Sequence, residues 1–223
     1  MNTQIFKLIP LALWQTLSMI GITLVFSLFL GFALGLYLYF IDKKICKKHL
    51  LSQGLSLMID GVRSFPFSIL IIALLPLSKW IFGSSFGLKA ALFPMTLAAS
   101  CYFARLCHQT FHTLPKEILD AATLMGFGKR DLASKLIFKE TLPMLIQNAA
   151  LLANALLGYS AMAGLIGAGG LGKLAIDYGY YRFNLPILLI NIFIILLIGK
   201  AIQFLGDFWF KKLMIKRGLY GKN

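Results

Sequence analysis

Few side chains in this 223-residue chain could perform chemistry, since it holds three histidines, three cysteines and eight carboxylates. His108 and His112 stand four residues apart, a spacing that puts two imidazoles on one helix face and suits a metal pair. They lack the intervening Glu of a zinc-protease motif, and no third ligand is evident nearby, so we interpret them as histidines at a membrane interface. No Ser/His/Asp or Cys/His arrangement stands out either, and we expect no catalysis by this chain.

A glycine-rich segment at residues 167–174 imitates two nucleotide-binding motifs with the order Gly-Ala-Gly-Gly-Leu-Gly-Lys-Leu. A phosphate-binding P-loop needs Ser or Thr after its lysine to hold magnesium, and Leu174 cannot do so. Neither version of the motif is flanked by a predicted strand, so we predict that the chain binds no nucleotide. Irregular backbone at membrane depth must be covered by protein or line a water-filled cavity. A gate or docking surface fits this requirement, and a flexible outer loop is the alternative.

Two opposite charges, Asp60 and Arg63, interrupt an otherwise apolar stretch. Each would cost about 2.5–3.5 kcal/mol at the middle of a membrane span. Their spacing of three residues lets them pair on one helix face, which favours a place inside an assembly. They could form a polar lining of a translocation pathway, or a structural ion pair that fixes helix packing, which we prefer.

The composition restricts the class of protein. Hydrophobic residues make up 59% of the chain and the mean hydropathy is +0.81, which predicts an all-α integral membrane protein. The net charge of +14 comes from basic residues beside apolar stretches, so we interpret it as orientation signals and lipid contacts rather than nucleic-acid binding. Three cysteines without paired spacing predict no disulfide framework.

The apolar stretches are long enough for five membrane spans in a single domain covering residues 1–223, because about 20 apolar residues cross the hydrocarbon. Pro66 is expected to kink the second span. Gly31 and Gly35 could form a close-packing face in the first span, or occur at this spacing by chance. The predicted spans run over residues 13–41, 50–77, 86–107, 142–165 and 183–205.

A polar interval at residues 114–141 separates the third and fourth spans, and its first part is typical of a short helix. Pro115 suits the first turn, and the negative charge of Glu117 suits the N-terminal half. Gly126 allows the left-handed residue that ends such a helix. We therefore predict a helix from Pro115 to Met125, followed by a second short helix.

This helix has an apolar side that nothing nearby in the sequence would cover. Its members recur at i, i+3, i+4 and i+7 and are Ile118, Ala121, Ala122 and Met125. Such a face predicts docking into a groove of another protein. A helical connector lying against the membrane is the alternative.

The distribution of basic residues predicts the sidedness of the chain. Fifteen Lys and Arg residues follow the first span, accompany the polar interval or close the chain, whereas five border the opposite ends of the spans. Since cytoplasmic loops carry the excess of Lys and Arg, we expect the polar interval and the C-terminus in the cytoplasm and the N-terminus outside.

Residues 120–126, Asp-Ala-Ala-x-x-x-Gly, resemble the cytoplasmic "EAA" loop of ABC-importer permeases, whose coupling helix sits in a cleft of the ATPase subunit. Asp120 replaces the Glu of the family, which keeps the charge and shortens its reach. Phe-Lys at residues 138–139 also replaces the Leu-Pro of the broader pattern. The resemblance assigns ATPase coupling to Ile118, Asp120, Ala121, Ala122, Met125 and Gly126.

Residues 158–172 closely resemble the corresponding stretch of methionine-importer permeases, and segments 63–67 and 178–181 continue the likeness. The resemblance implies that Tyr159, Ser160 and Met162 approach their copies across a two-fold axis and close the pathway on the outer side.

The resemblance implies a type I ABC importer transmembrane domain with five membrane helices, in the bacterial cytoplasmic (inner) membrane. It implies a homodimer with two ABC ATPase subunits, which would hold ATP and Mg²⁺, and an extracytoplasmic substrate-binding protein. The implied function is D-/L-methionine uptake, with no cofactor bound by this chain. A permease for another small amino acid stays open, as does an ATP-independent secondary transporter, although the inverted repeats and paired intramembrane carboxylates of that class are not evident.

Overall fold

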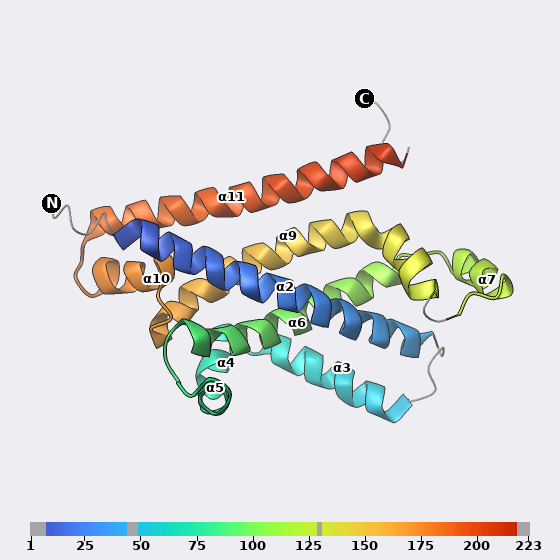
Figure 1. The fold of residues 1–223 in the computed structure, drawn as a ribbon, viewed down its shortest axis with the longest axis horizontal. Coiled ribbons are helices and arrows are strands. Elements are labelled where there is room, and N and C mark those ends of the chain that lie inside the picture. The colour runs from blue at the N-terminus through green and yellow to red at the C-terminus, as the bar shows by residue number, and fades with distance from the viewer. Residues whose placement is uncertain (1–7, 44–48, 129–130, 218–223) are drawn as a thin grey trace.

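The computed structural model describes residues 8–43, 49–128 and 131–217, and none of these residues forms a strand. The predicted all-α fold is therefore confirmed. The long helix α9 packs against α11, α6 and α2, and α2 crosses α9 and packs closely on α6 (Figure 1). Their bounds are Leu8–Asp42 for α2, Leu88–His112 for α6, Phe138–Ala163 for α9 and Leu185–Lys216 for α11.

Four helices of the described part are long and apolar enough to cross a membrane, and a bent helix pair would make a fifth span. This pair joins α3 (His49–Ser64) to α4 (Phe67–Ala73) through a bend of 111°. The interruption falls at Pro66 as predicted, but it is a sharp break between two helices rather than a kink within one helix. Pro66 lacks an N–H and disfavours helical backbone at the preceding residue, so the helix ends there rather than bending gently. A further helix, α5 (Leu75–Phe82), follows.

Glycines bring α2 and α6 into close contact. A Cβ on Gly31 would lie 2.8 Å from the carbonyl oxygen of Ser100, and one on Gly35 would lie 2.6 Å from that of Ala104. Both separations are shorter than real Cβ contacts allow, so this approach of the two backbones requires glycine. The close-packing interpretation of the Gly-xxx-Gly pair is confirmed.

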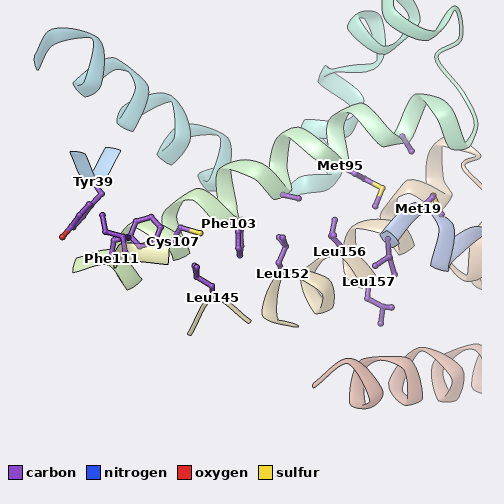
Figure 2. Packing of buried hydrophobic residues seen from close by; sticks show 14 of the residues in the cluster. Met19, Tyr39, Met95, Phe103, Cys107, Phe111, Leu145, Leu152, Leu156 and Leu157 are labelled. Carbon is purple, nitrogen blue, oxygen red and sulfur yellow. The ribbon is translucent and has the colours of Figure 1, made fainter. Parts of the chain in front are cut away.

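The buried core runs between α2, α6 and α9, with smaller contributions from the shorter elements (Figure 2). Phe32 of α2 meets the rings of Phe111 and Phe138 edge-on, each at a centroid distance of 5.6 Å, a favoured geometry for aromatic pairs. The side chains labelled in the figure are Met19, Tyr39, Met95, Phe103, Cys107, Phe111, Leu145, Leu152, Leu156 and Leu157. This core ties the three helices into one unit, to which α7 (Lys116–Leu124) attaches at one end (Figure 1).

Candidate coupling helix and gate

The polar interval folds into the helix that its sequence predicts, because both of its ends are defined. Pro115 directly precedes α7, and Glu117 lies in its first turn, where negative charge is favourable. Gly126 takes a left-handed φ of 79°. Its N–H donates to the carbonyl oxygen of Thr123 at 3.0 Å, and that of Phe127 donates to Ala122 at 3.1 Å. This pair of hydrogen bonds is a Schellman motif, which closes the helix end.

One side of α7 is anchored to the body of the protein. Leu119 and Ala122 are buried and join the same core cluster as Leu114 and Leu132. Ala122 is only 1% exposed, so it is not available to a docking partner. The prediction that Ala122 belongs to the docking face is therefore wrong. Ala122 instead packs against the core of the same chain, where a small side chain fits.

The opposite side of α7 is free in the single chain. Asp120 and Ala121 are exposed, and so are Ile118 and Met125. Leu124, which the sequence interpretation omitted, is 89% exposed, more than any other large hydrophobic side chain in the described part of the chain. It stands three residues after Ala121, a spacing that makes the two side chains neighbours on the helix surface. An apolar side chain this exposed at a helix end indicates a docking surface.

The three residues assigned to the gate have different surroundings. Tyr159 stacks on Phe67 of α4, with a centroid distance of 4.2 Å and an interplanar angle of 17°. Ser160 is buried, and its Oγ donates to the carbonyl oxygen of Leu157 at 2.7 Å. Met162 is 46% exposed at the end of α9. Of these three, Met162 is therefore the side chain that can meet a second copy, whereas the other two fix the helix end.

The glycine-rich segment forms a packed turn. It contains α10 (Gly170–Leu174) and is flanked by η2 (Gly164–Ile166) and η3 (Ala175–Tyr180). The N–H of Gly170 donates to Gln15 Oε1 at 2.8 Å, and that of Leu171 donates to Thr16 Oγ1 at 2.9 Å. Because α2 covers the segment and occupies these amides, the alternative of a flexible outer loop is wrong.

Asp60 and Arg63 belong to a cluster of three charges. Asp60 forms an ion pair with Arg105 of α6 and lies 3.7 Å from Arg63. Arg105 lies 45 positions after Asp60 in the sequence, and the sequence patterns did not connect the two. The cluster links α3 to α6, as the structural interpretation of the charge pair requires. The sequence does contain a signal for this cluster, because Arg105 is a third charged residue in an apolar region. Nothing in the sequence around Arg105 identifies Asp60 as its partner.

A third potential metal ligand lies beside the histidine pair. Asp42, the last residue of α2, places Oδ2 2.7 Å from His108 Nε2 and 3.4 Å from His112 Nε2. The expectation that no third ligand lies nearby is therefore wrong. The two histidines and the carboxylate are 66 or more positions apart in the sequence, and the packing of α2 on α6 brings them together.

Residues 31–214 match the family described as "Binding-protein-dependent transport system inner membrane component". The chain belongs to this family. The matched range includes α7, residues 158–172 with the three predicted gate residues, and the charge cluster. This match confirms the permease class that the EAA-like loop predicts. It also confirms the prediction that the chain is a component of the inner membrane.

Relatives with nearly the same length support a narrower grouping within these permeases. The chain is 37% identical over 208 residues, 93% of this chain and 96% of the other, to the probable D-methionine transport system permease protein MetI of Pasteurella multocida. It is 36% identical to the methionine import system permease protein MetP of Bacillus subtilis, over 67% of this chain and 68% of the other.

A solved structure shows the same architecture. A chain of the MetNI methionine ABC transporter, in an inward-facing conformation, superposes with a TM-score of 0.91 at 30% identity. The superposition covers 95% of this chain and 99% of that chain. The permease therefore has the type I ABC importer transmembrane fold.

Proposed function

We propose that this chain is the permease subunit of an ATP-driven importer of D- and L-methionine. The observation that carries the proposal is the agreement over 95% of the chain with a subunit of the MetNI methionine transporter. The curated relatives bear methionine permease names across distant bacteria. Residues 158–172 resemble the corresponding stretch of methionine-importer permeases, and the glycine-rich turn in this stretch is packed against α2. Both observations are compatible with the proposal.

The proposed assembly is a homodimer with two ABC ATPase subunits and an extracytoplasmic substrate-binding protein. The exposed apolar side of α7 supports an ATPase docking surface. Met162 and Leu165, both exposed and apolar, support contact with a second copy near the gate. Binding of ATP and Mg²⁺ belongs to the ATPase in this proposal, and this chain acts without catalysis or a bound cofactor of its own.

The structure suggests how an ATPase would move this chain. Because Leu119 and Ala122 anchor α7 in the core cluster, a displacement of the helix would be passed to the packed helices rather than absorbed by a loose loop. Closure of the ATPase dimer would then favour one packing of the paired bundles over another, opening the pathway alternately to each side.

The proposed sidedness places α7 in the cytoplasm and the N-terminus outside. Figure 1 supports it, because α7 and the C-terminal ends of α2 and α11 lie at one end of the molecule, whereas α10 and the beginning of α2 lie at the other. The helix ends that border the three basic regions therefore share one side.

The test is uptake of labelled L-methionine by proteoliposomes that contain the complete transporter, with the ATPase and the binding protein. In vesicles whose ATPase faces the lumen, ATP in the lumen should drive uptake of methionine from the bath, and excess unlabelled L- or D-methionine in the bath should compete. Absence of ATP-driven uptake of labelled methionine, with ATP-driven uptake of a different labelled amino acid, would replace methionine as the substrate. Uptake that persists without ATP and follows an ion gradient would support a secondary transporter instead.

A further inference from the structure

Three side chains with metal-binding atoms converge where the ends of α2 and α6 meet. Asp42, His108 and His112 each offer one such atom, and the three atoms lie within 4.8 Å of one another. His108 and His112 lie one turn apart on α6, with their Nε2 atoms 3.3 Å apart. Both imidazoles direct Nε2 toward the same carboxylate oxygen, Asp42 Oδ2.

The spacing of the three atoms suits a small cation. Zinc bonds of about 2.0–2.1 Å at tetrahedral angles would separate neighbouring ligand atoms by roughly 3.3 Å. The observed separations are 3.3 Å between the two nitrogens, and 3.4 Å and 2.7 Å from them to Asp42 Oδ2. Two of the three edges therefore already have the length that such a site needs, and the shortest must open slightly.

Hydrogen bonding satisfies this arrangement less well. A neutral imidazole nitrogen either donates or accepts, whereas an ionised carboxylate only accepts. If both Nε2 atoms carry hydrogens toward Asp42, those two N–H groups oppose each other across 3.3 Å. If one Nε2 lacks its hydrogen, it can accept from the other Nε2 at 3.3 Å, but its lone pair then also faces the carboxylate oxygen at 3.4 Å or less. A cation between the three atoms accepts a lone pair from each and removes the conflict.

The surroundings of the three side chains also favour a positive ion, and the site is accessible to solvent. Asp42 ends α2 and His112 ends α6, so the partial negative charges of two helix C-termini meet at the cluster. The Asp42 side chain is 52% exposed, and that of His108 is 13% exposed. The ring of Tyr39 packs edge-on against His112 with a centroid distance of 5.1 Å, which limits the rotation of that imidazole. Arg105 is engaged by Asp60.

We propose that Asp42, His108 and His112 form a binding site for a divalent first-row transition-metal ion of the zinc type, which joins the end of α2 to the end of α6. Two imidazoles and one carboxylate suit Zn²⁺ and its neighbours rather than Ca²⁺ or Mg²⁺, which prefer oxygen ligands. Three protein ligands leave at least one position for water. The site lies four residues before α7 begins, so metal binding would fix the base of the coupling helix.

The test is titration of the purified full-length chain with Co²⁺, followed by displacement with Zn²⁺. The parent protein carries Cys46→Ser, so that this thiol cannot supply the signal, and the two cysteines in α6 are buried. We expect one equivalent of Co²⁺ with the strong visible absorption of a tetrahedral site, its loss on adding Zn²⁺, and a higher melting temperature with either metal.

Variants identify the ligands. His108→Gln, His112→Gln and Asp42→Asn should each weaken Co²⁺ binding by more than about tenfold, since even groups behind the ligands commonly contribute 10–100-fold. His49→Gln removes the remaining histidine of the chain and should bind as the parent does. Unchanged melting temperatures without metal would show that the variants are folded. Failure of the folded parent to bind, or equal binding by the folded ligand variants, would overturn the proposal in favour of a hydrogen-bonded cluster only.

Discussion

At the scale of single residues, the contact between α2 and α6 depends on the absence of two side chains. Gly35→Ala would place a Cβ 2.6 Å from the carbonyl oxygen of Ala104. We expect the variant to lose about 1–3 kcal/mol of stability, the typical cost of overpacking, seen as a lower melting temperature of the purified protein.

A second glycine of α2 provides the control for that substitution. Gly21→Ala meets no atom within 4 Å, so it should leave stability unchanged or raise it by up to about 1 kcal/mol through helix propensity. If Gly35→Ala and Gly21→Ala had the same melting temperature, the close approach of α2 and α6 would not contribute to stability.

The charge cluster makes a second residue-scale prediction. Asp60→Asn leaves Arg63 and Arg105 without their counter-charge, and uncompensated charge inside a membrane protein is costly. We expect less folded protein in the membrane and a lower melting temperature, with partial recovery in the double variant Asp60→Asn with Arg105→Gln. Asp131→Asn is the control, because its exposed pair with Lys135 should contribute little. An equal loss in both single variants would argue against the cluster.

The sequence predicted residues better than it predicted their partners. Local spacing correctly identified Gly126 as a helix end and Asp60 with Arg63 as neighbours. It could not identify Arg105 beside Asp60, or Asp42 beside His108, because those contacts join positions 45 and 66 residues apart. Such pairs are set by how α3 and α2 pack on α6, and no periodic pattern in one segment records that packing.

At the scale of elements, the sequence located the four long helices, because apolar length and the positions of Gly and Pro are local signals. The predicted ends were less accurate, since α11 continues to Lys216 and the predicted span ends at residue 205. The sequence also predicted a kink at Pro66. It did not predict the 111° bend there, because the angle depends on how α4 and α5 pack against the rest of the bundle. It likewise placed Ala122 on the docking face, since a period of 3.6 cannot tell which apolar side a helix turns inward.

The end of α7 gives the element-scale prediction. Gly126 has a φ of 79°, which costs a residue with a Cβ roughly 1–2 kcal/mol. Gly126→Ala should therefore fray the last turn of α7 and reduce coupled uptake of the reconstituted transporter. Gly128→Ala lies two residues on, has no positive φ and meets no atom within 4 Å, so it should transport normally. Equal transport by both variants would show that the Schellman motif is not needed for coupling.

At the scale of the whole molecule, sidedness can be measured directly. In a Cys46→Ser background, Thr123→Cys places an exposed thiol on α7, and Ser84→Cys places one after α5. The charge distribution predicts that a membrane-impermeant reagent labels Cys at position 84 in intact cells, but labels the α7 position only after the membrane is opened. The reverse pattern would invert the proposed topology.

The central claim is that a cytosolic ATPase binds α7 and moves the permease through it. The most direct test measures methionine uptake and ATP hydrolysis in the same preparation. Methionine uptake and ATP hydrolysis are recorded together for reconstituted transporters carrying Leu124→Asp, or Lys135→Ala as a nearby exposed control. Because Leu124 is 89% exposed, its replacement should leave the subunit folded. We predict that Leu124→Asp lowers uptake per ATP hydrolysed by roughly tenfold or more, within the range of typical coupling energies, while the control matches the parent. Undiminished uptake by a folded Leu124→Asp transporter would contradict the claim.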